Sequence, residues 1–282
     1  MKIFQRKIDL SKYLKSFKNA GKSIGFVPTM GALHAGHLAL VRKSLNDNDV
    51  SVVSIFVNPT QFDNPDDLKK YPRTYKADLD ALKSLDTEII VYYPDAEDIY
   101  DGKIVSESFD FDGLEHEMEG KYRPGHFDGV ATIVKKLFEI IKPTRAYFGE
   151  KDFQQLQIIR KLVTKEKMEI IIVPVPIFRE RDGLAMSSRN KRLTEEFRKT
   201  APFIYKTLLI TKQMWKEHSI QEIKNFVTKR FNEHPLLKLE YFEIADEKFL
   251  KTANKKISGN KYRGFIVVYA GDIRLIDNIA YY

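Results

Sequence analysis

Residues 23–37 read SIGFVPTMGALHAGH, a stretch that passes from an apolar run through a glycine-containing turn into a more polar segment. The apolar run at 23–28 predicts a buried strand, and the pattern at 36–46 predicts a helix. Gly31 and Gly36 would let the backbone of the turn approach a ligand closely. The start of a helix presents unpaired N–H groups and a partial positive charge, both of which favour phosphate. The stretch therefore predicts a strand–turn–helix unit that binds an anion.

The alternation of strand and helix patterns continues through the first two thirds of the chain. Short apolar strands are predicted at 50–57, 87–92, 146–148 and 169–173, and amphipathic helices at 75–85, 130–141 and 154–164. This alternation is typical of a parallel sheet with helices on both faces. Ligands of such sheets bind at the carboxyl ends of the strands, near the topological switch point. We therefore expect an α/β, Rossmann-like domain over residues 1–176.

The pattern changes beyond about residue 178. Two helices are predicted at 194–212 and 220–232, followed by strands at 238–245 and 263–270. This order indicates a smaller α+β domain, which we expect to span residues 177–282 and to act as a lid.

Composition excludes several classes of protein. The chain has 282 residues, of which 43% are hydrophobic and 30% charged, and it has no cysteine. The absence of cysteine excludes a disulfide scaffold, a thiolate metal site and a cysteine nucleophile. No apolar run approaches the roughly 20 residues that span a bilayer, and the N-terminus lacks the apolar core of a signal peptide. We expect a cytoplasmic protein without a membrane partner.

The formal net charge of +8 lies entirely in the residues from 178 onward. This excess fits a lobe that closes over an anionic ligand such as ATP, and it fits equally a lysine-rich solvated face such as 248–261. The basic residues are not interleaved with aromatic residues as in an RNA-binding motif. Nucleic acid is therefore the weaker hypothesis.

His34 and His37 stand three positions apart at the predicted start of the first helix. Each could donate a hydrogen bond to a phosphate oxygen, above all as charge builds during phosphoryl or nucleotidyl transfer. The alternatives are an ordinary surface loop and a zinc pair. Zinc needs a third protein ligand and is usually accompanied by a glutamate base in H-E-x-x-H, a spacing that differs from this one.

The HAGH segment at 34–37 resembles the H-x-G-H signature of the nucleotidyltransferase superfamily. The longer string PTMGALHAGH at 28–37 is more specific and resembles the pantothenate synthetase family, also called pantoate–β-alanine ligases. Further segments similar to this family follow in order along the chain. They are FVNPTQF at 56–62, YPRT at 71–74, RPGHFDGVATIVKKLF at 123–138, FGEKDFQQ at 148–155, DGLAMSSRN at 182–190 and, more weakly, RLIDN at 274–278.

The resemblance implies a reaction and its participants. ATP, with Mg²⁺, would drive the condensation of (R)-pantoate with β-alanine to pantothenate, AMP and pyrophosphate through a pantoyl-adenylate intermediate. Because a carboxylate is a poor electrophile, its transfer to the α-phosphate of ATP creates a good leaving group. The resemblance also implies a homodimer. The rivals are another carboxylate-activating ligase of the same superfamily, against which NPTQF and GEKDFQQ argue, and an RNA-binding module whose binding would be sensitive to salt.

The resemblance also implies roles for individual residues. The catalytic residues would be His37, as proton donor to the departing pyrophosphate, together with His34 and Lys151. Gln61 would contact pantoate and β-alanine, Gln155 would contact pantoate, and the metal ligands remain unassigned. The ATP site would comprise Met30, Gly31, Ala32, Leu33, His34, Ala35, Gly36, His37, Gly149, Glu150, Lys151, Asp152, Phe178, Met186, Ser187, Ser188 and Arg189.

Taken without the resemblance, several of these residues have ordinary interpretations. A loop glutamine such as Gln61 is usually solvent-exposed, Gln155 fits a helix surface, and Asp152 fits a helix N-cap. Two positions depart from the family pattern. Phe178 stands where the family usually has a smaller aliphatic residue, so we expect the local shape of the adenine pocket to differ. Asp128 replaces a basic or small residue, and it would weaken anion binding unless its side chain points away.

Overall fold

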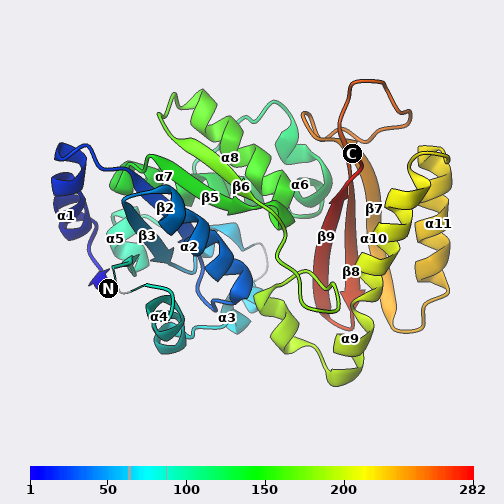
Figure 1. Cartoon of the computed structure of the whole chain (residues 1–282), viewed down its shortest axis with the longest axis horizontal. Coiled ribbons are helices and arrows are strands. Elements are labelled where there is room, and N and C mark those ends of the chain that lie inside the picture. The colour runs from blue at the N-terminus through cyan, green and yellow to red at the C-terminus, as the bar shows by residue number, and fades with distance from the viewer. Residues whose placement is uncertain (63–64, 87) are drawn as a thin grey trace. The chain divides into compact units, whose positions relative to one another are not determined.

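The computed structural model describes residues 1–62, 65–86 and 88–282 of the chain (Figure 1). These residues form two compact units. The first unit comprises residues 1–150 and 154–176, and the second comprises residues 151–153 and 177–282. The short segment 151–153 thus groups with the C-terminal part of the chain.

The first unit is built on a six-stranded sheet in which every neighbouring pair of strands is parallel. The strand order is β1-β4-β3-β2-β5-β6. The strands are β1 (Lys2–Phe4), β2 (Ile24–Thr29), β3 (Val50–Ile55), β4 (Ile90–Tyr92), β5 (Arg145–Gly149) and β6 (Ile171–Val175). The helices are α1 (Lys7–Asn19), α2 (Ala35–Asp47), α3 (Pro65–Lys70), α4 (Tyr75–Lys83), α5 (Ala96–Tyr100), α6 (Met118–Tyr122), α7 (His126–Ile141) and α8 (Phe153–Lys165).

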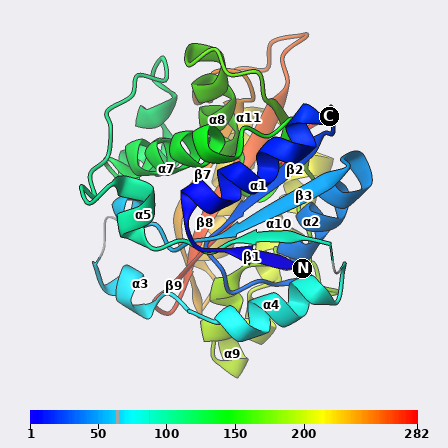
Figure 2. The same cartoon turned by 90° about the vertical axis from the view of Figure 1, so that its left-hand side faces the viewer.

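Helices cover both faces of this sheet because successive strand residues point to opposite sides. On one side, Val27 packs in a buried cluster with Val41 of α2 and Leu82 of α4. On the other side, the ring of Phe26 lies 6.2 Å from that of Phe138 in α7. Figure 2 shows α1 and α7 on one side of the strands and α4 on the other.

The strand order places the topological switch point at β2. The chain runs outward from β2 through β3 to β4, and then crosses back so that β5 pairs with the opposite edge of β2. The carboxyl ends of β3, β2 and β5 are therefore neighbours at one edge of the sheet. This is the edge at which open α/β sheets bind their ligands.

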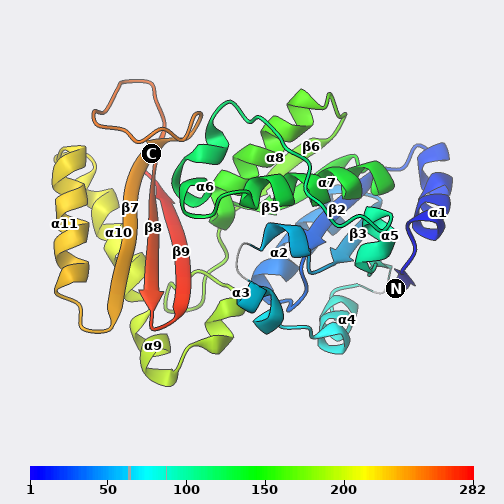
Figure 3. The same cartoon turned by 180° about the vertical axis from the view of Figure 1, so that it is seen from behind.

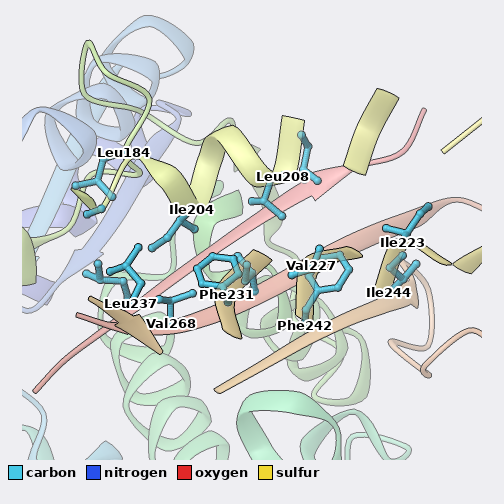
Figure 4. Close-up of a cluster of buried hydrophobic side chains, with 14 of the residues drawn as sticks. Leu184, Ile204, Leu208, Ile223, Val227, Phe231, Leu237, Phe242, Ile244 and Val268 are labelled. Carbon is cyan, nitrogen blue, oxygen red and sulfur yellow. The ribbon is translucent and has the colours of Figure 1, made fainter. Parts of the chain in front are cut away.

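The second unit contains a three-stranded antiparallel sheet, β7 (Leu237–Asp246), β8 (Tyr262–Ala270) and β9 (Ile273–Ala280). Its helices are α9 (Glu195–Thr200), α10 (Phe203–Met214) and α11 (Ile220–Asn232), and α10 and α11 run beside the sheet (Figure 3). The core of the unit is apolar and lies between helices and sheet, as Figure 4 shows for Leu208, Val227, Phe231, Phe242 and Val268.

The predicted fold class is confirmed: an α/β unit with a parallel sheet and a C-terminal α+β unit. The prediction of a single helix at 194–212 is wrong. The structure has two helices there, α9 and α10, on either side of Pro202. Proline has no N–H to donate to the preceding turn, so the helix breaks there. The strand predicted at 169–173 lies two residues later, at an edge of the sheet where Pro174 is tolerated.

Two further strands, β1 and β9, were not predicted from the sequence. The strand predicted at 87–92 is observed as β4, and Thr87 lies outside the described residues. Among the described residues, no helix combines the length and the apolar character needed to cross a membrane.

Candidate active site

The turn between β2 and α2 is held by a buried carboxylate from α4. Asp78 is 2% exposed. Its Oδ2 accepts a hydrogen bond from the N–H of Ala32 at 3.0 Å, and its Oδ1 accepts one from the N–H of Leu33 at 2.7 Å. Thr74 Oγ1 also donates to Asp78 Oδ1, at 3.2 Å. The carboxylate thereby satisfies backbone donors that a turn buried against the sheet cannot offer to water.

The backbone of this turn requires a glycine and strains an alanine. Gly31 has φ of +79° and Ala32 has φ of +50°. A Cβ at Gly31 would lie 3.1 Å from Asp78 Oδ2 and from Ile55 Cγ2. Left-handed backbone costs a residue with a side chain about 1–2 kcal/mol, which the two hydrogen bonds to Asp78 offset. The turn is therefore set in one conformation by a residue far away in the sequence.

The two histidines lie together at the start of α2. His34 occupies the N-cap position, and its backbone N–H donates to Nδ1 of His37 at 3.4 Å. The two imidazole rings are 4.0 Å apart between centroids and inclined by 30°. Because Nδ1 of His37 acts as an acceptor, the proton of the neutral ring is assigned to Nε2, the nitrogen that would donate to a phosphate oxygen. Met30, Ala35 and Gly36 complete this half-buried turn.

A second turn, Pro59–Gln61, follows β3 and carries the predicted glutamine. Asn58, only 1% exposed, donates from Nδ2 to Gln61 Oε1 at 3.2 Å and to the carbonyl of Gly129 at 3.1 Å. Its Oδ1 accepts from the hydroxyl of Tyr100 at 2.5 Å. Burial raises the pKa of Tyr100, so this hydroxyl stays protonated and donates. With Oε1 accepting from Asn58, the NH₂ group of Gln61 is the end that suits a carboxylate or hydroxyl oxygen of a ligand.

Helix α7 and Arg123, which precedes it, hold the backbone of the same turn. The carbonyl of Gln61 lies 2.8 Å from Nδ1 of His126 and 3.3 Å from Nη2 of Arg123. A Cβ added to Gly129 would lie 2.2 Å from the carbonyl oxygen of Thr60, so only glycine allows this approach. The structure thus brings Gln61 together with the segment 123–129, which sequence reasoning did not connect to it.

Asp128, one of the two departures from the family pattern, is engaged by the protein itself. Its Oδ1 accepts a hydrogen bond from the N–H of Phe109 at 3.0 Å. The Asp128 carboxylate thus orders the loop at residue 109, which gives the acidic side chain at position 128 a structural role.

The two adjacent glutamines of α8 have different surroundings. Gln154 is buried: its Nε2 donates to the carbonyls of Leu114 and Glu117, each at 2.8 Å, and its Oε1 accepts from the N–H of Glu119 at 3.0 Å. Gln155 is half-buried. Since Gln154 is fully used in holding the segment 114–119, Gln155 is the glutamine of this pair that suits a ligand.

The remaining predicted ATP-binding residues begin where β5 ends. Gly149 closes β5, and Glu150 opens the short turn Glu150–Asp152. Lys151 and Asp152 belong to the second unit, and Nζ of Lys151 lies 3.6 Å from Oδ1 of Asp152. The turn therefore presents a cation and a carboxylate side by side.

Residues 178–186 of the second unit form a hairpin that leads into the segment Met186–Arg189. The N–H of Met186 donates to the carbonyl of Phe178 at 3.0 Å, while the Phe178 side chain is 43% exposed. Ser187 caps the turn that follows, with its Oγ accepting from the N–H of Arg189 at 3.3 Å. Ser188 is buried. The segment is ordered by the backbone hydrogen bond to Phe178 and by the side chain of Ser187.

Residues for a metal ion are sparse. In the part of the chain that the structure describes, no group of three or more His, Asp or Glu side chains is arranged to hold a metal. Mg²⁺ commonly keeps several waters and is bound by one or two carboxylates together with substrate phosphates. The exposed carboxylate of Asp152 fits that mode of binding, in which the ligand supplies most of the coordination.

Two residues of this site were missed by sequence reasoning although the sequence carried a signal for each. Asp78 lies on the apolar side of its helix, four positions before Leu82. A carboxylate buried on that side needs hydrogen-bond donors from elsewhere in the protein. Asn58 directly follows the strand predicted at 50–57, and polar side chains just past such a strand lie at the binding edge of the sheet.

Comparisons with known proteins show to which family the chain is similar. A family model described as pantoate-beta-alanine ligase matches residues 2–280. The chain is 58% identical over 280 residues to the pantothenate synthetase of Flavobacterium psychrophilum, and 54% identical over 280 residues to that of Christiangramia forsetii, with 99% of each chain covered in both cases.

Solved structures are similar over the same length. A pantothenate synthetase from Thermus thermophilus superposes with a TM-score of 0.91 at 36% identity, with 100% of both chains covered. A pantoate-beta-alanine ligase from Francisella tularensis, crystallised with beta-gamma ATP and beta-alanine, has a TM-score of 0.79 at 36% identity and covers 100% of this chain and 98% of its own. With the family model matching almost every residue and with relatives far above 30% identity, the chain belongs to the pantoate-beta-alanine ligase family.

Proposed function

We propose that this chain performs the ATP-dependent ligation of pantoate and β-alanine, the activity of its family, through a pantoyl-adenylate intermediate. The observation that carries the proposal is the placement of two turns at neighbouring strand ends. One is the start of α2 with His34 and His37, which suits phosphate, and the other holds the oriented amide of Gln61, which suits a carboxylate. Activation of an acid by ATP needs these two kinds of group side by side.

The chemistry of this ligation has two steps. An oxygen of the pantoate carboxylate attacks the α-phosphorus of ATP, the bond to the β-phosphate oxygen breaks, and pyrophosphate leaves. The neutral amine of β-alanine then attacks the acyl carbon of the adenylate, a proton is lost, and AMP leaves with pantothenate as product. Neither step needs a covalent enzyme intermediate, which accords with a chain that has no cysteine.

His37 is the proposed proton donor to the departing pyrophosphate. Its Nδ1 accepts from the backbone of His34, so Nε2 carries the proton that would be shared with a phosphate oxygen. The partial positive charge at the start of α2 would add to the stabilisation of the developing charge. His34, whose ring lies 4.0 Å from that of His37, is proposed to contact the phosphates as well.

The other roles follow from the chemistry of each side chain. The NH₂ group of Gln61 would donate to pantoate and later to β-alanine, and Gln155 would donate to pantoate. Lys151, the two serines at 187 and 188, and Arg189 would bind the triphosphate as cations and hydrogen-bond donors. The remaining residues of the proposed ATP site, apart from Asp152, would line the nucleotide, and Phe178 would contact the adenine through its backbone.

Mg²⁺ bound to the triphosphate would neutralise part of its charge and orient the leaving group. The protein would contribute at most the Asp152 carboxylate, directly or through water. We further propose that the chain acts as a homodimer. Light scattering would then give twice the chain mass of 32.8 kDa.

The test measures pyrophosphate and AMP released from ATP and Mg²⁺, first with pantoate and then with β-alanine added. AMP and pantothenate should form only when both acids are present. Pyrophosphate release that neither acid stimulates would point to another substrate. Absence of any ATP chemistry, with salt-sensitive binding of RNA, would refute the ligase in favour of a nucleic-acid-binding protein.

Two variants test the assigned residues. His37→Ala should lower turnover by about a hundredfold or more, the usual contribution of a general acid, while His116→Ala, at an exposed histidine, serves as the matched control. Gln61→Ala should raise KM for pantoate and β-alanine and spare ATP, with the exposed Gln213→Ala as control. An equal loss of ATP affinity in Gln61→Ala would contradict its assignment.

A further inference from the structure

The RLIDN segment at 274–278, which the proposed function leaves without a role, lies in β9 of the second unit. Asp277 and Asn278 are consecutive strand residues, so their side chains point to opposite faces of the antiparallel sheet. Both are buried, at 5% and 2% exposure. Two adjacent buried polar residues in a strand demand partners on both faces.

On one face, Asn278 holds the segment 151–153. Its Nδ2 donates to the carbonyl oxygen of Lys151 at 2.9 Å, and its Oδ1 accepts from Nη1 of Arg263 at 2.6 Å. The guanidinium of Arg263 lies 3.9 Å from the ring centroid of Phe153, and its Nε donates to Glu247 at 2.8 Å. The segment is thus tied to the sheet at its first residue by a hydrogen bond and at its last residue by stacking.

On the other face, Asp277 holds the hairpin of residues 178–186. Its two carboxylate oxygens accept from Nη1 and Nη2 of Arg179 at 2.6 and 2.9 Å. The same guanidinium donates to the carbonyl of Gly183 at 3.0 Å and lies 3.6 Å from the ring centroid of Tyr205. The hairpin ends at Met186, directly before the serines and the arginine assigned to the triphosphate.

Stability alone is a weak explanation for this arrangement. Replacing a buried ion pair by apolar side chains of similar volume is often neutral or stabilising. What apolar side chains cannot do is fix the carbonyl of Lys151 and the guanidinium of Arg179 at defined points. Both contacts lead to segments that the proposed function assigns to the phosphates of ATP.

We propose that Asp277 and Asn278 are positioning residues for ATP: Asn278 fixes the turn that carries Lys151, and Asp277, through Arg179, fixes the hairpin that leads to Ser187–Arg189. Neither residue touches substrate. One strand thereby sets two phosphate-binding segments of the second unit before the nucleotide arrives. This inference rests on the proposed function, since it assumes that Lys151 contacts ATP.

The experiment uses Asn278→Asp in the full chain, because the aspartate keeps the acceptor for Arg263 and replaces only the donor to Lys151. The affinity for ATP is measured by titration, and KM is measured for each of the three substrates. Loss of one hydrogen bond predicts ATP binding weakened by about five- to tenfold, with KM for pantoate and β-alanine unchanged. The control is Asn254→Asp, which adds the same charge at an exposed loop position of the same unit.

A double-mutant cycle with Lys151→Ala identifies the route of the effect. If Asn278 acts through the Lys151 side chain, Asn278→Asp should have little further effect on ATP affinity once Lys151 is alanine. Additive losses would overturn the proposal, as would wild-type ATP affinity in Asn278→Asp. If Asn278→Asp does not fold, Asn278→Ala replaces it in the same cycle.

The outcomes also separate the inference from the proposed function. Weak ATP binding by Lys151→Ala together with normal binding by Asn278→Asp would leave the function standing and overturn the positioning role. Normal ATP binding by Lys151→Ala would refute the assignment of Lys151 and the inference with it. For the second contact, Asp277→Asn should weaken ATP binding in the wild-type background. It should have a smaller effect in Arg189→Ala, where only Ser187 and Ser188 remain to be positioned. An unchanged affinity in the wild-type background, or an equal loss in both backgrounds, would overturn that part.

Discussion

The Asp78 carboxylate offers a direct test of how the HAGH turn is held. Asp78→Asn keeps the shape of the side chain but leaves one oxygen where there were two. That oxygen can accept from the N–H of Ala32 or of Leu33, and the new NH₂ group must then face the other N–H. The substitution therefore removes one hydrogen bond from the backbone of the turn. It also places the new NH₂ group against a buried backbone N–H, so that two donors face each other.

The magnitude follows from the contact that is lost. A hydrogen bond to a charged acceptor contributes about 1.5–3 kcal/mol, so we expect the free energy of unfolding to fall by about 2–3 kcal/mol. Ala32, at φ of +50°, adds about 1–2 kcal/mol of backbone strain that is no longer fully offset. The turn should therefore leave its observed conformation in part of the population, and KM for ATP should rise.

Urea unfolding followed by circular dichroism gives the stability, and initial rates of pyrophosphate release give KM for ATP. Asp80→Asn, at an exposed carboxylate of the same helix, is the matched control and should change stability by less than about 0.5 kcal/mol. If Asp78→Asn behaved like Asp80→Asn in both assays, the turn would hold itself and the reasoning would be wrong. A loss of stability with unchanged KM would mean that ATP binding does not depend on this turn.

Three further predictions concern other contacts. Gly129→Ala forces a Cβ against the Thr60 carbonyl and should destabilise the protein by about 1–3 kcal/mol, with KM for pantoate rising more than KM for ATP in steady-state assays. Asn58→Asp removes the donor to Gln61 Oε1 and should raise KM for pantoate while the affinity for ATP measured by titration stays the same. Burial lowers the pKa of His234, whose Nδ1 accepts two backbone N–H groups, so its contribution to stability is complete above its ordinary pKa and is lost as the pH falls below it. The urea midpoint should drop between pH 7 and pH 5, and by less in His234→Asn.

Much of the fold was predictable because strands and helices leave local signatures. The runs at 24–29 and 50–55 and the helix at 153–165 depend on residues only a few positions apart, and their periodicity is visible in the sequence. β9 escaped prediction because Asp277 and Asn278 interrupt its apolar pattern. Their partners lie elsewhere in the chain, so no local rule could identify a strand there.

The sequence by itself determined the strand–turn–helix unit at 24–47, the alternation that implies a parallel sheet, and the ordered motifs that mark the family. The tertiary structure alone decided how the side chains of the site are held. Asp78 reaches Ala32 across 46 positions, and Asn278 reaches Lys151 across 127. The physical reason is that periodicity reports only on neighbours within a few residues. A buried hydrogen-bond donor takes whichever acceptor the packed chain brings within about 3 Å, however distant that acceptor is in the sequence.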